Sequence, residues 1–212
     1  MPLVKVEKIN TTSCWALWHI TESLEMLLQL SDDIDIENFY FENIKHPLKQ
    51  KEWLAARLVL KNLTKRLNKN YKGSLKNPYG KPFLINNTMY VSITNSYPFA
   101  AGIICEKAPV GIDLEIPKDK LKYLAPKFLN KEELHTANGD LFKLCIYWCA
   151  KEALFKIYGR HKISFKENLF IAPFNPDEAS NITGTISTEN KILKYDICFK
   201  VIDKYIVCYN VN

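Results

Sequence analysis

Three carboxylates in two short segments are the residues best suited to chemistry. Asp113 and Glu115 lie in VGIDLE (110–115), and Glu152 lies in WCAKEALFKIYG (148–159). Side chains of an extended segment alternate between two faces, so Asp113 and Glu115 are expected to point the same way. Neighbouring carboxylates repel each other unless a cation joins them, and oxygen ligands suit a hard cation such as Mg²⁺. The residue types therefore predict a metal site.

The second segment predicts a helix that brings Glu152 to this site. The residues that share its helical face are Leu141, Cys145 and Trp148. An ionised carboxylate in such apolar surroundings is costly unless it is paired or binds a metal. Lys151 and Lys156 flank Glu152, so we expect them to place positive charge beside the metal and to attract a polyphosphate.

A purely structural explanation of these residues stays open. Asp113 and Glu115 could form the polar side of a half-exposed strand, and Glu152 with Lys156 is an i,i+4 pair worth roughly 0.3 kcal/mol. However, a GxDxE strand followed by a W-x-x-K-E-x-x-x-K helix is an uncommon combination. The order of the two segments favours a functional site.

This combination resembles the 4′-phosphopantetheinyl transferases of the larger, surfactin-synthetase-activating type. The resemblance covers most of the chain, and its strongest motifs lie between Gly80 and Gly159. It implies transfer of the phosphopantetheine arm of coenzyme A to a serine of an acyl or peptidyl carrier protein, with release of adenosine 3′,5′-bisphosphate. It also implies Mg²⁺ bound by Asp113, Glu115 and Glu152. Glu152, directly or through a metal-bound water, would be the general base for the serine, since no motif places a histidine for that task. Lys156 would stabilise the developing negative charge.

The same resemblance implies a coenzyme A site. Arg57 matches an arginine of an early helix that helps bind the nucleotide end, and Lys81 matches the lysine of a G-K-P-aromatic turn that reaches a phosphate. Asn95 stands where the family has a histidine, and an amide can donate a hydrogen bond to phosphate but cannot carry a positive charge. Structural alternatives are a surface arginine on an amphipathic helix and an ordinary turn. The residues expected to bind coenzyme A are Arg57, Lys81, Thr94, Asn95, Ser96, Lys151 and Lys156.

The segment FLNKEEL (128–134) is similar to a further motif of that family, F-[LF]-x-x-x-E. Asn130 and Glu133 have the spacing of a helix capping box, in which each side chain bonds the backbone N–H of the other residue. We therefore expect this motif to be structural.

Composition predicts a globular cytoplasmic protein. With 47% hydrophobic residues, a chain of 212 residues can bury a sizeable core. No apolar run approaches about eighteen residues, and the N-terminus lacks the apolar core of a signal peptide. The six cysteines contain no CxxC pair and are expected to be reduced and buried, with Cys145 and Cys149 close enough to touch.

The net charge of +6 suits an acidic protein partner such as an acyl carrier protein. Two alternatives remain. Asn95 favours a non-catalytic relative that binds coenzyme A or a carrier protein, and the basic, aromatic-containing stretch 61–81 suggests a nucleic-acid-binding protein. No nucleic-acid-binding motif accompanies that stretch, so we expect neither nucleic acid nor membrane as partner, and a monomer.

The order of elements predicts an α+β fold built as a pseudo-dimer of two similar lobes. Each lobe would carry helices on a small antiparallel sheet, with lobe 1–108 holding the nucleotide end of coenzyme A and lobe 109–212 holding the metal carboxylates. Further helical segments are expected from Asp119 onward. The predicted helices are 22–30, 47–67 and 141–158, and the predicted strands are 3–9, 14–20, 83–85, 89–94, 100–105, 110–115, 169–172, 182–187, 194–202 and 205–211.

Overall fold

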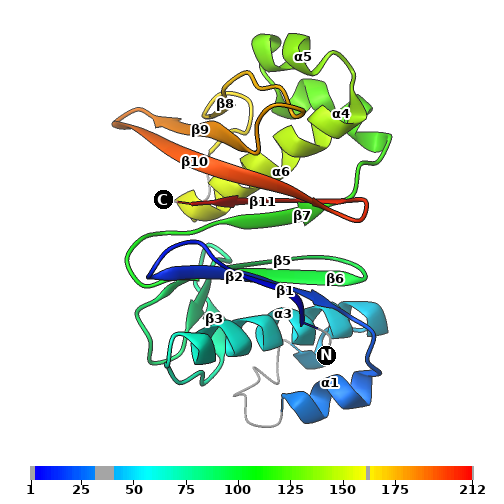
Figure 1. The fold of residues 1–212 in the computed structure, drawn as a ribbon, viewed down its shortest axis with the longest axis vertical. Helices are drawn as coiled ribbons and strands as arrows, with labels where there is room; N and C mark the ends of the chain where they lie inside the picture. Colours follow the sequence, from blue (N-terminus) through cyan, green and yellow to red (C-terminus); the bar gives the residue numbers. More distant parts are fainter. Residues whose placement is uncertain (1–2, 32–40, 161–162, 212) are drawn as a thin grey trace. The chain divides into compact units, whose positions relative to one another are not determined.

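The computed structural model describes residues 3–31, 41–160 and 163–211. The chain forms two compact units, Met1–Val110 and Gly111–Asn212. Each unit combines helices with antiparallel strands (Figure 1), so the predicted α+β class is confirmed. The sequence places the division between lobes at 108/109. That the two units are copies of one fold stays a prediction.

The first unit is a four-stranded antiparallel sheet in the order β1-β2-β6-β5, with a long helix, α3, on one face (Figure 1). Every residue of the central strand β6 is buried, whereas the outer strand β1 has no fully buried residue. Pro47 begins α3, as predicted, because its missing N–H falls where a helix needs none. The elements are β1 (Leu3–Lys8), β2 (Ser13–His19), α1 (Leu24–Leu30), α3 (Pro47–Arg66), β3 (Ser74–Lys76), β4 (Pro82–Leu84), β5 (Tyr90–Ser96) and β6 (Phe99–Cys105).

The second unit is a five-stranded antiparallel sheet in the order β7-β11-β10-β9-β8, packed on the helix α6 (Figure 1). The Asp140 side chain caps the first turn of α6, and Gly159 ends the helix in the left-handed conformation at φ 65°. Both ends of α6 lie where the sequence predicts them. The elements are β7 (Ile112–Glu115), α4 (Lys120–Phe128), α5 (Lys131–Ala137), α6 (Leu141–Tyr158), β8 (Leu169–Ile171), β9 (Asn181–Thr188), β10 (Lys191–Ile202) and β11 (Tyr205–Asn210).

Most predicted elements are present with ends within three residues of those expected, and one strand was missed. Ser74–Lys76 pairs with Pro82–Leu84 as the short ribbon β3-β4, inside a stretch that sequence analysis treats as a polar loop. Three residues with two lysines nearby give too short a hydrophobic pattern to reveal a strand.

Strand β7 and helix α6 approach each other closely at Gly111. A Cβ atom at this position would overlap the backbone carbonyl of Ala153 in α6. The N–H of Gly111 donates to Asn210 Oδ1 at 2.9 Å, which fixes the start of β7 against β11. The glycine of the GxDxE motif therefore sets the distance between the strand and the helix that carry the carboxylates.

We predict that Gly111→Ala destabilises the protein by roughly 3 kcal/mol, because the methyl group can be accommodated only by moving backbone. Urea unfolding measures this change. Gly184→Ala is the matched control, since its Cβ would lie 3.0 Å from the end of the flexible Leu154 side chain, which can move. Equal losses for the two variants would contradict the backbone contact at Gly111.

Candidate active site

Asp113 and Glu115 lie on the face of the second sheet that α6 covers. In the β7–β11 register Asp113 is opposite Cys208, and Glu115 is opposite Ile206. Directly opposite residues share a face, and both partners belong to the apolar core that contains the inner side of α6. The alternation expected from the sequence therefore places the two carboxylates between strand and helix.

Lys156 of α6 contacts β7 directly. Its Nζ donates to Asp113 Oδ1 at 2.8 Å and to the carbonyl oxygen of Ile112 at 2.8 Å. The Asp113 side chain is 10% exposed and that of Lys156 is 24% exposed, so water screens the pair only in part. The strand motif and the helix motif therefore meet through a charge-assisted hydrogen bond.

Glu152, one turn before Lys156 on α6, is half-buried and electrostatically linked to the same pair. Burial, together with the negative charge of Asp113, raises the pKa of Glu152 to about 7, against the opposing effect of Lys156. Because a general base works best with a pKa near the working pH, Glu152 is suited to accept a proton at neutral pH.

Glu115 is held by other groups. Its Oε1 accepts from Lys118 Nζ at 2.9 Å and from the N–H of Ile116 at 3.1 Å. Within the described part of the chain, no group of three or more His, Cys, Asp or Glu side chains is assembled closely enough to hold a metal ion. Mg²⁺ is commonly held by one or two carboxylates together with substrate phosphates. The donor set of Asp113 and Glu152 fits that requirement.

Three thiols lie beneath the carboxylates. Burial raises the pKa values of Cys149 and Cys208, and a hydrogen bond with Cys149, together with burial, raises that of Cys145. The charge of Asp113 adds to all three shifts. All six cysteines of the chain are buried and free of disulfides, as expected. These neutral thiols make the surroundings of the carboxylates less polar.

Lys151 does not join the carboxylates, and this corrects its expected placement beside Glu152. Its side chain has no exposed surface, and Nζ donates to Glu133 Oε2 at 2.6 Å, Phe128 O at 2.8 Å and Phe165 O at 2.9 Å. A helical wheel shows that Lys151 neighbours Glu152 but does not show where a long side chain ends. The ammonium turns into the core because a carboxylate is buried there to receive it.

Glu133 is the partner that sequence reasoning missed. The predicted capping box at the start of α5 is present: Asn130 Oδ1 accepts from Glu133 N at 2.8 Å, and Glu133 Oε2 accepts from Asn130 N at 2.9 Å. Oε1 also accepts from the N–H of Ile171 in β8 at 2.9 Å. The signal available was a lysine on an almost wholly apolar helix, which requires a buried acid in the same core.

In the first unit, Arg57 is 4% exposed on α3, so it is not the surface arginine of the structural alternative. Its Cζ lies 3.2 Å from the centre of the Trp53 ring, and Nη1 donates to Trp53 O at 3.2 Å. Lys81 follows a turn in which Asn77 Oδ1 accepts from its N–H. Burial lowers the pKa of Lys81 to about 8.

The three consecutive polar residues of β5 do not point the same way. Asn95 is opposite Ala100, which belongs to the core beneath α3, so Asn95 lies on the α3 side of the sheet and is exposed at its end. Thr94 and Ser96 lie on the opposite face, where Thr94 is buried and Ser96 is half-buried.

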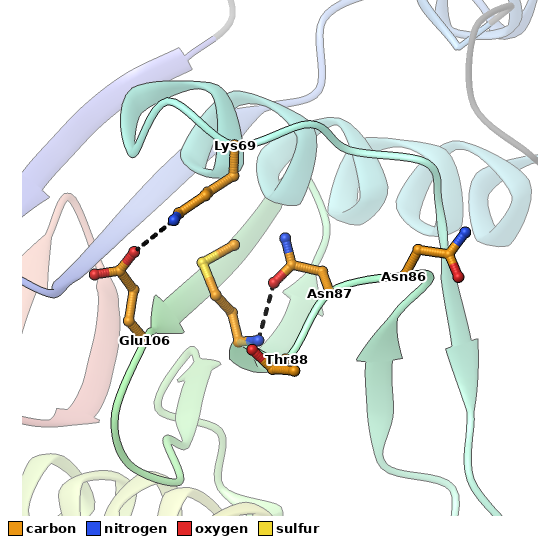
Figure 2. Close-up of a pocket in the computed structure, with 6 residues that line it drawn as sticks. Lys69, Asn86, Asn87, Thr88 and Glu106 are labelled. Atoms are coloured by element: carbon orange, nitrogen blue, oxygen red, sulfur yellow. Dashed lines mark hydrogen bonds and ion pairs between the residues drawn. The ribbon is translucent and has the colours of Figure 1, made fainter.

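A cavity of about 320 Å³ in the first unit contains none of the predicted site residues (Figure 2). An ion pair of 3.5 Å between Lys69 and Glu106 crosses one side, and Asn87 accepts a hydrogen bond from the N–H of Met89 (Figure 2). Its lining residues are Lys69, Asn86, Asn87, Thr88, Met89 and Glu106. All of these lining residues belong to the first unit.

Comparison with known proteins gives a family match for the second half of the chain. Residues 109–209 match the sequence profile of the 4′-phosphopantetheinyl transferase superfamily. This segment is slightly less than half of the chain and corresponds closely to the second unit. No curated protein is similar enough to count as a match. None of the described helices is long and apolar enough to cross a membrane. The match points to a transferase and supports phosphopantetheine transfer in general.

We predict that Glu152→Gln flattens the pH dependence of stability measured in EDTA. The pKa of Glu152 is raised from 4.5 to about 7 on folding, so the folded state binds this proton more tightly than the unfolded chain. Glu152 therefore imposes no penalty below the unfolded pKa, an increasing penalty as pH rises to about 7, and its full penalty above that. Relative to the variant, the wild type should lose about 3 kcal/mol between about pH 4.5 and 8. Parallel curves from urea unfolding would contradict the shift.

Proposed function

We propose that the protein transfers the phosphopantetheine arm of coenzyme A to a serine of an apo acyl or peptidyl carrier protein and releases adenosine 3′,5′-bisphosphate. The observation that carries the proposal is the junction of Asp113, Glu152 and Lys156 between β7 and α6, within the segment that matches the superfamily. The W-x-x-KE-x-x-x-K helix and the additional first unit favour the larger, surfactin-synthetase-activating type.

Asp113 and Glu152 would hold Mg²⁺, and Glu115 would join them by exchanging its contact with Lys118. When bound, the ion neutralises charge on the pyrophosphate of coenzyme A. Lys156 already lies at Asp113, so its ammonium is available to stabilise the negative charge that develops on the leaving oxygen.

Glu152 would act as the general base for the acceptor serine. The serine oxygen forms a bond to the phosphorus that carries pantetheine, and its proton moves to the Glu152 carboxylate. The bond from that phosphorus to the bridging oxygen breaks, and this oxygen leaves on adenosine 3′,5′-bisphosphate. In the metal-free protein burial raises the pKa of Glu152 to about 7, and a bound cation would favour its ionised form, which is the form that takes the proton.

In the first unit, Arg57, Lys81, Thr94, Asn95 and Ser96 would bind the nucleotide end of coenzyme A. Stacking on Trp53 restricts the Arg57 guanidinium, which reduces the entropy lost when it binds a phosphate. With a pKa of about 8, Lys81 is mostly protonated at neutral pH. Asn95 can donate a hydrogen bond to a phosphate oxygen. Lys151 is omitted from this set because its ammonium is buried in the core.

The carrier protein would dock on the exposed face of α4. Residues 118–131 contain five lysines and one aspartate. Lys120, Tyr123 and Lys127 share one side of the helix, and Tyr123 is 82% exposed. Only four residues separate the end of β7 from the start of α4, so the basic helix follows the carboxylate strand closely in the chain. An exposed aromatic side chain among lysines suits an acidic helical protein. We place the protein in the cytoplasm, as a monomer.

A non-catalytic relative that binds coenzyme A or a carrier protein is the second candidate. It is favoured by Asn95, an uncharged residue where the family has a histidine. A protein of that kind would bind its ligands and leave the carrier unmodified.

We predict that an apo carrier protein gains the mass of phosphopantetheine when incubated with this protein, coenzyme A and Mg²⁺, and that EDTA prevents the gain. Asp113→Ala and Glu152→Ala should each lower the rate by more than about 100-fold, since a charge-stabilising contact contributes roughly 3 kcal/mol. Intact-protein mass spectrometry gives both results. Glu132→Ala, at an exposed position of α5, is the control. Coenzyme A binding without transfer to any carrier would instead support the second candidate.

We predict that Lys120→Glu/Lys127→Glu raises the KM for the carrier protein at least about 10-fold and leaves the KM for coenzyme A unchanged, because the charge reversal repels an acidic partner. Steady-state kinetics at two salt concentrations measures this effect, which added salt should reduce. Lys191→Glu/Lys194→Glu, on β10, is the matched double reversal and should change little. An unaltered KM for the carrier in the α4 variant would reject this docking face.

A further inference from the structure

We propose that the buried Lys151–Glu133 ion pair is a positioning device that fixes the rotation of α6 and thereby aims Glu152 at Asp113. The inference rests on the proposed function, because it assigns Lys151 to the geometry of the metal and base site. It replaces the phosphate-binding role expected from the sequence.

The first argument is the number of hydrogen bonds that Lys151 can donate. A lysine ammonium has three N–H groups, and Lys151 Nζ has three acceptors at 2.6–2.9 Å: Glu133 Oε2, Phe128 O and Phe165 O. The side chain has no exposed surface. Lys151 therefore has no donor left for a phosphate and no path to one without breaking this arrangement.

The second argument is what the pair connects. Phe128 ends α4, and Glu133 lies in the first turn of α5. Phe165 follows α6, and Ile171, which donates to Glu133 Oε1, belongs to β8. One ion pair thus links α6 to two other helices, a loop and a strand. A helix held from several sides cannot turn about its own axis without breaking these bonds.

The third argument is the location of Glu152 among the anchors of α6. Lys151 is bonded to Glu133 of α5, and Lys156 is bonded to Asp113 of β7. Between them, the Ala153 carbonyl lies against Gly111. Successive residues of a helix point about 100° apart, so Lys151 and Ala153 point to either side of Glu152. A rotation of α6 about its own axis would move Glu152 away from Asp113. The anchors at 151, 153 and 156 bracket Glu152 and restrict its direction.

The fourth argument is energetic. Burying a charged pair costs desolvation energy, and well-packed apolar residues are often equally stable in its place. Stability alone therefore does not require a lysine and a glutamate here. The pair makes five directional hydrogen bonds, one within itself and four to other groups, and these define one orientation of α6, whereas apolar contacts would permit several.

The test is the variant Lys151→Met/Glu133→Gln, which leaves the net charge unchanged. We expect kcat for phosphopantetheine transfer to fall about 100-fold, as a small misplacement of a reacting group can cause, while the KM for coenzyme A stays within about threefold. Without substrates, we expect Mn²⁺ affinity, followed by electron paramagnetic resonance, to fall at least about 10-fold, as when residues that orient metal ligands are removed.

Two further variants guard against misfolding and non-specific effects. Lys166→Met is the matched control, because Lys166 also donates to a carbonyl of α4, that of Pro126 at 3.0 Å, and forms no ion pair with a carboxylate among the described residues. It should leave kcat and Mn²⁺ affinity unchanged. Lys151→Arg keeps the charge and can still donate to Glu133. We expect it to restore folding and a substantial part of kcat if the double variant is unstable.

A higher KM for coenzyme A with unchanged kcat would overturn the proposal and restore Lys151 as a phosphate ligand. Unchanged kcat, KM and Mn²⁺ affinity in a folded double variant would also overturn it, leaving the pair a packing feature. If the wild-type protein modifies no carrier, the proposed function fails, and Mn²⁺ affinity still decides whether the ion pair positions the carboxylates.

Discussion

The backbone contact between Gly111 and Ala153 is the constraint on which the second unit depends. Strand and helix can approach this closely only because position 111 has no side chain. Two residues after Gly111, Asp113 accepts a hydrogen bond from Lys156. Its negative charge helps to raise the pKa of Glu152 and of the nearby thiols. A wider separation would leave the strand carboxylates and the helix residues as two unrelated polar surfaces, each solvated separately.

Two lysines of α6, five positions apart, have opposite environments. Lys156 remains partly exposed and contacts the carboxylate of β7, whereas Lys151 is wholly enclosed and contacts the cap of α5. The two lysines therefore contribute in different ways. Lys156 can move toward negative charge that develops during a reaction, whereas Lys151 is held in place. The difference arises from where the available carboxylates lie, since each ammonium reaches the nearest buried acid.

The sequence predicts features that depend on local periodicity and capping. It gives both ends of α6, the start of α3 at Pro47, the shared face of Asp113 and Glu115, and the capping box at Asn130. It does not give contacts that depend on where long side chains end, such as Lys151 with Glu133 or Lys118 with Glu115. The sequence motif Thr94–Asn95–Ser96 also does not state which way each side chain faces. Alternation along the strand turns Asn95 away from Thr94 and Ser96.

The three thiols beneath Asp113 have a consequence for redox chemistry. Oxidants and electrophiles attack the thiolate, and a buried thiol with a raised pKa forms very little of it. Cys145, Cys149 and Cys208 are all of this kind. These thiols therefore resist oxidation to sulfenic or sulfinic acid. Such oxidation would introduce polar oxygens between the helix and the sheet. These three cysteines thus need not make the carboxylate site sensitive to peroxide.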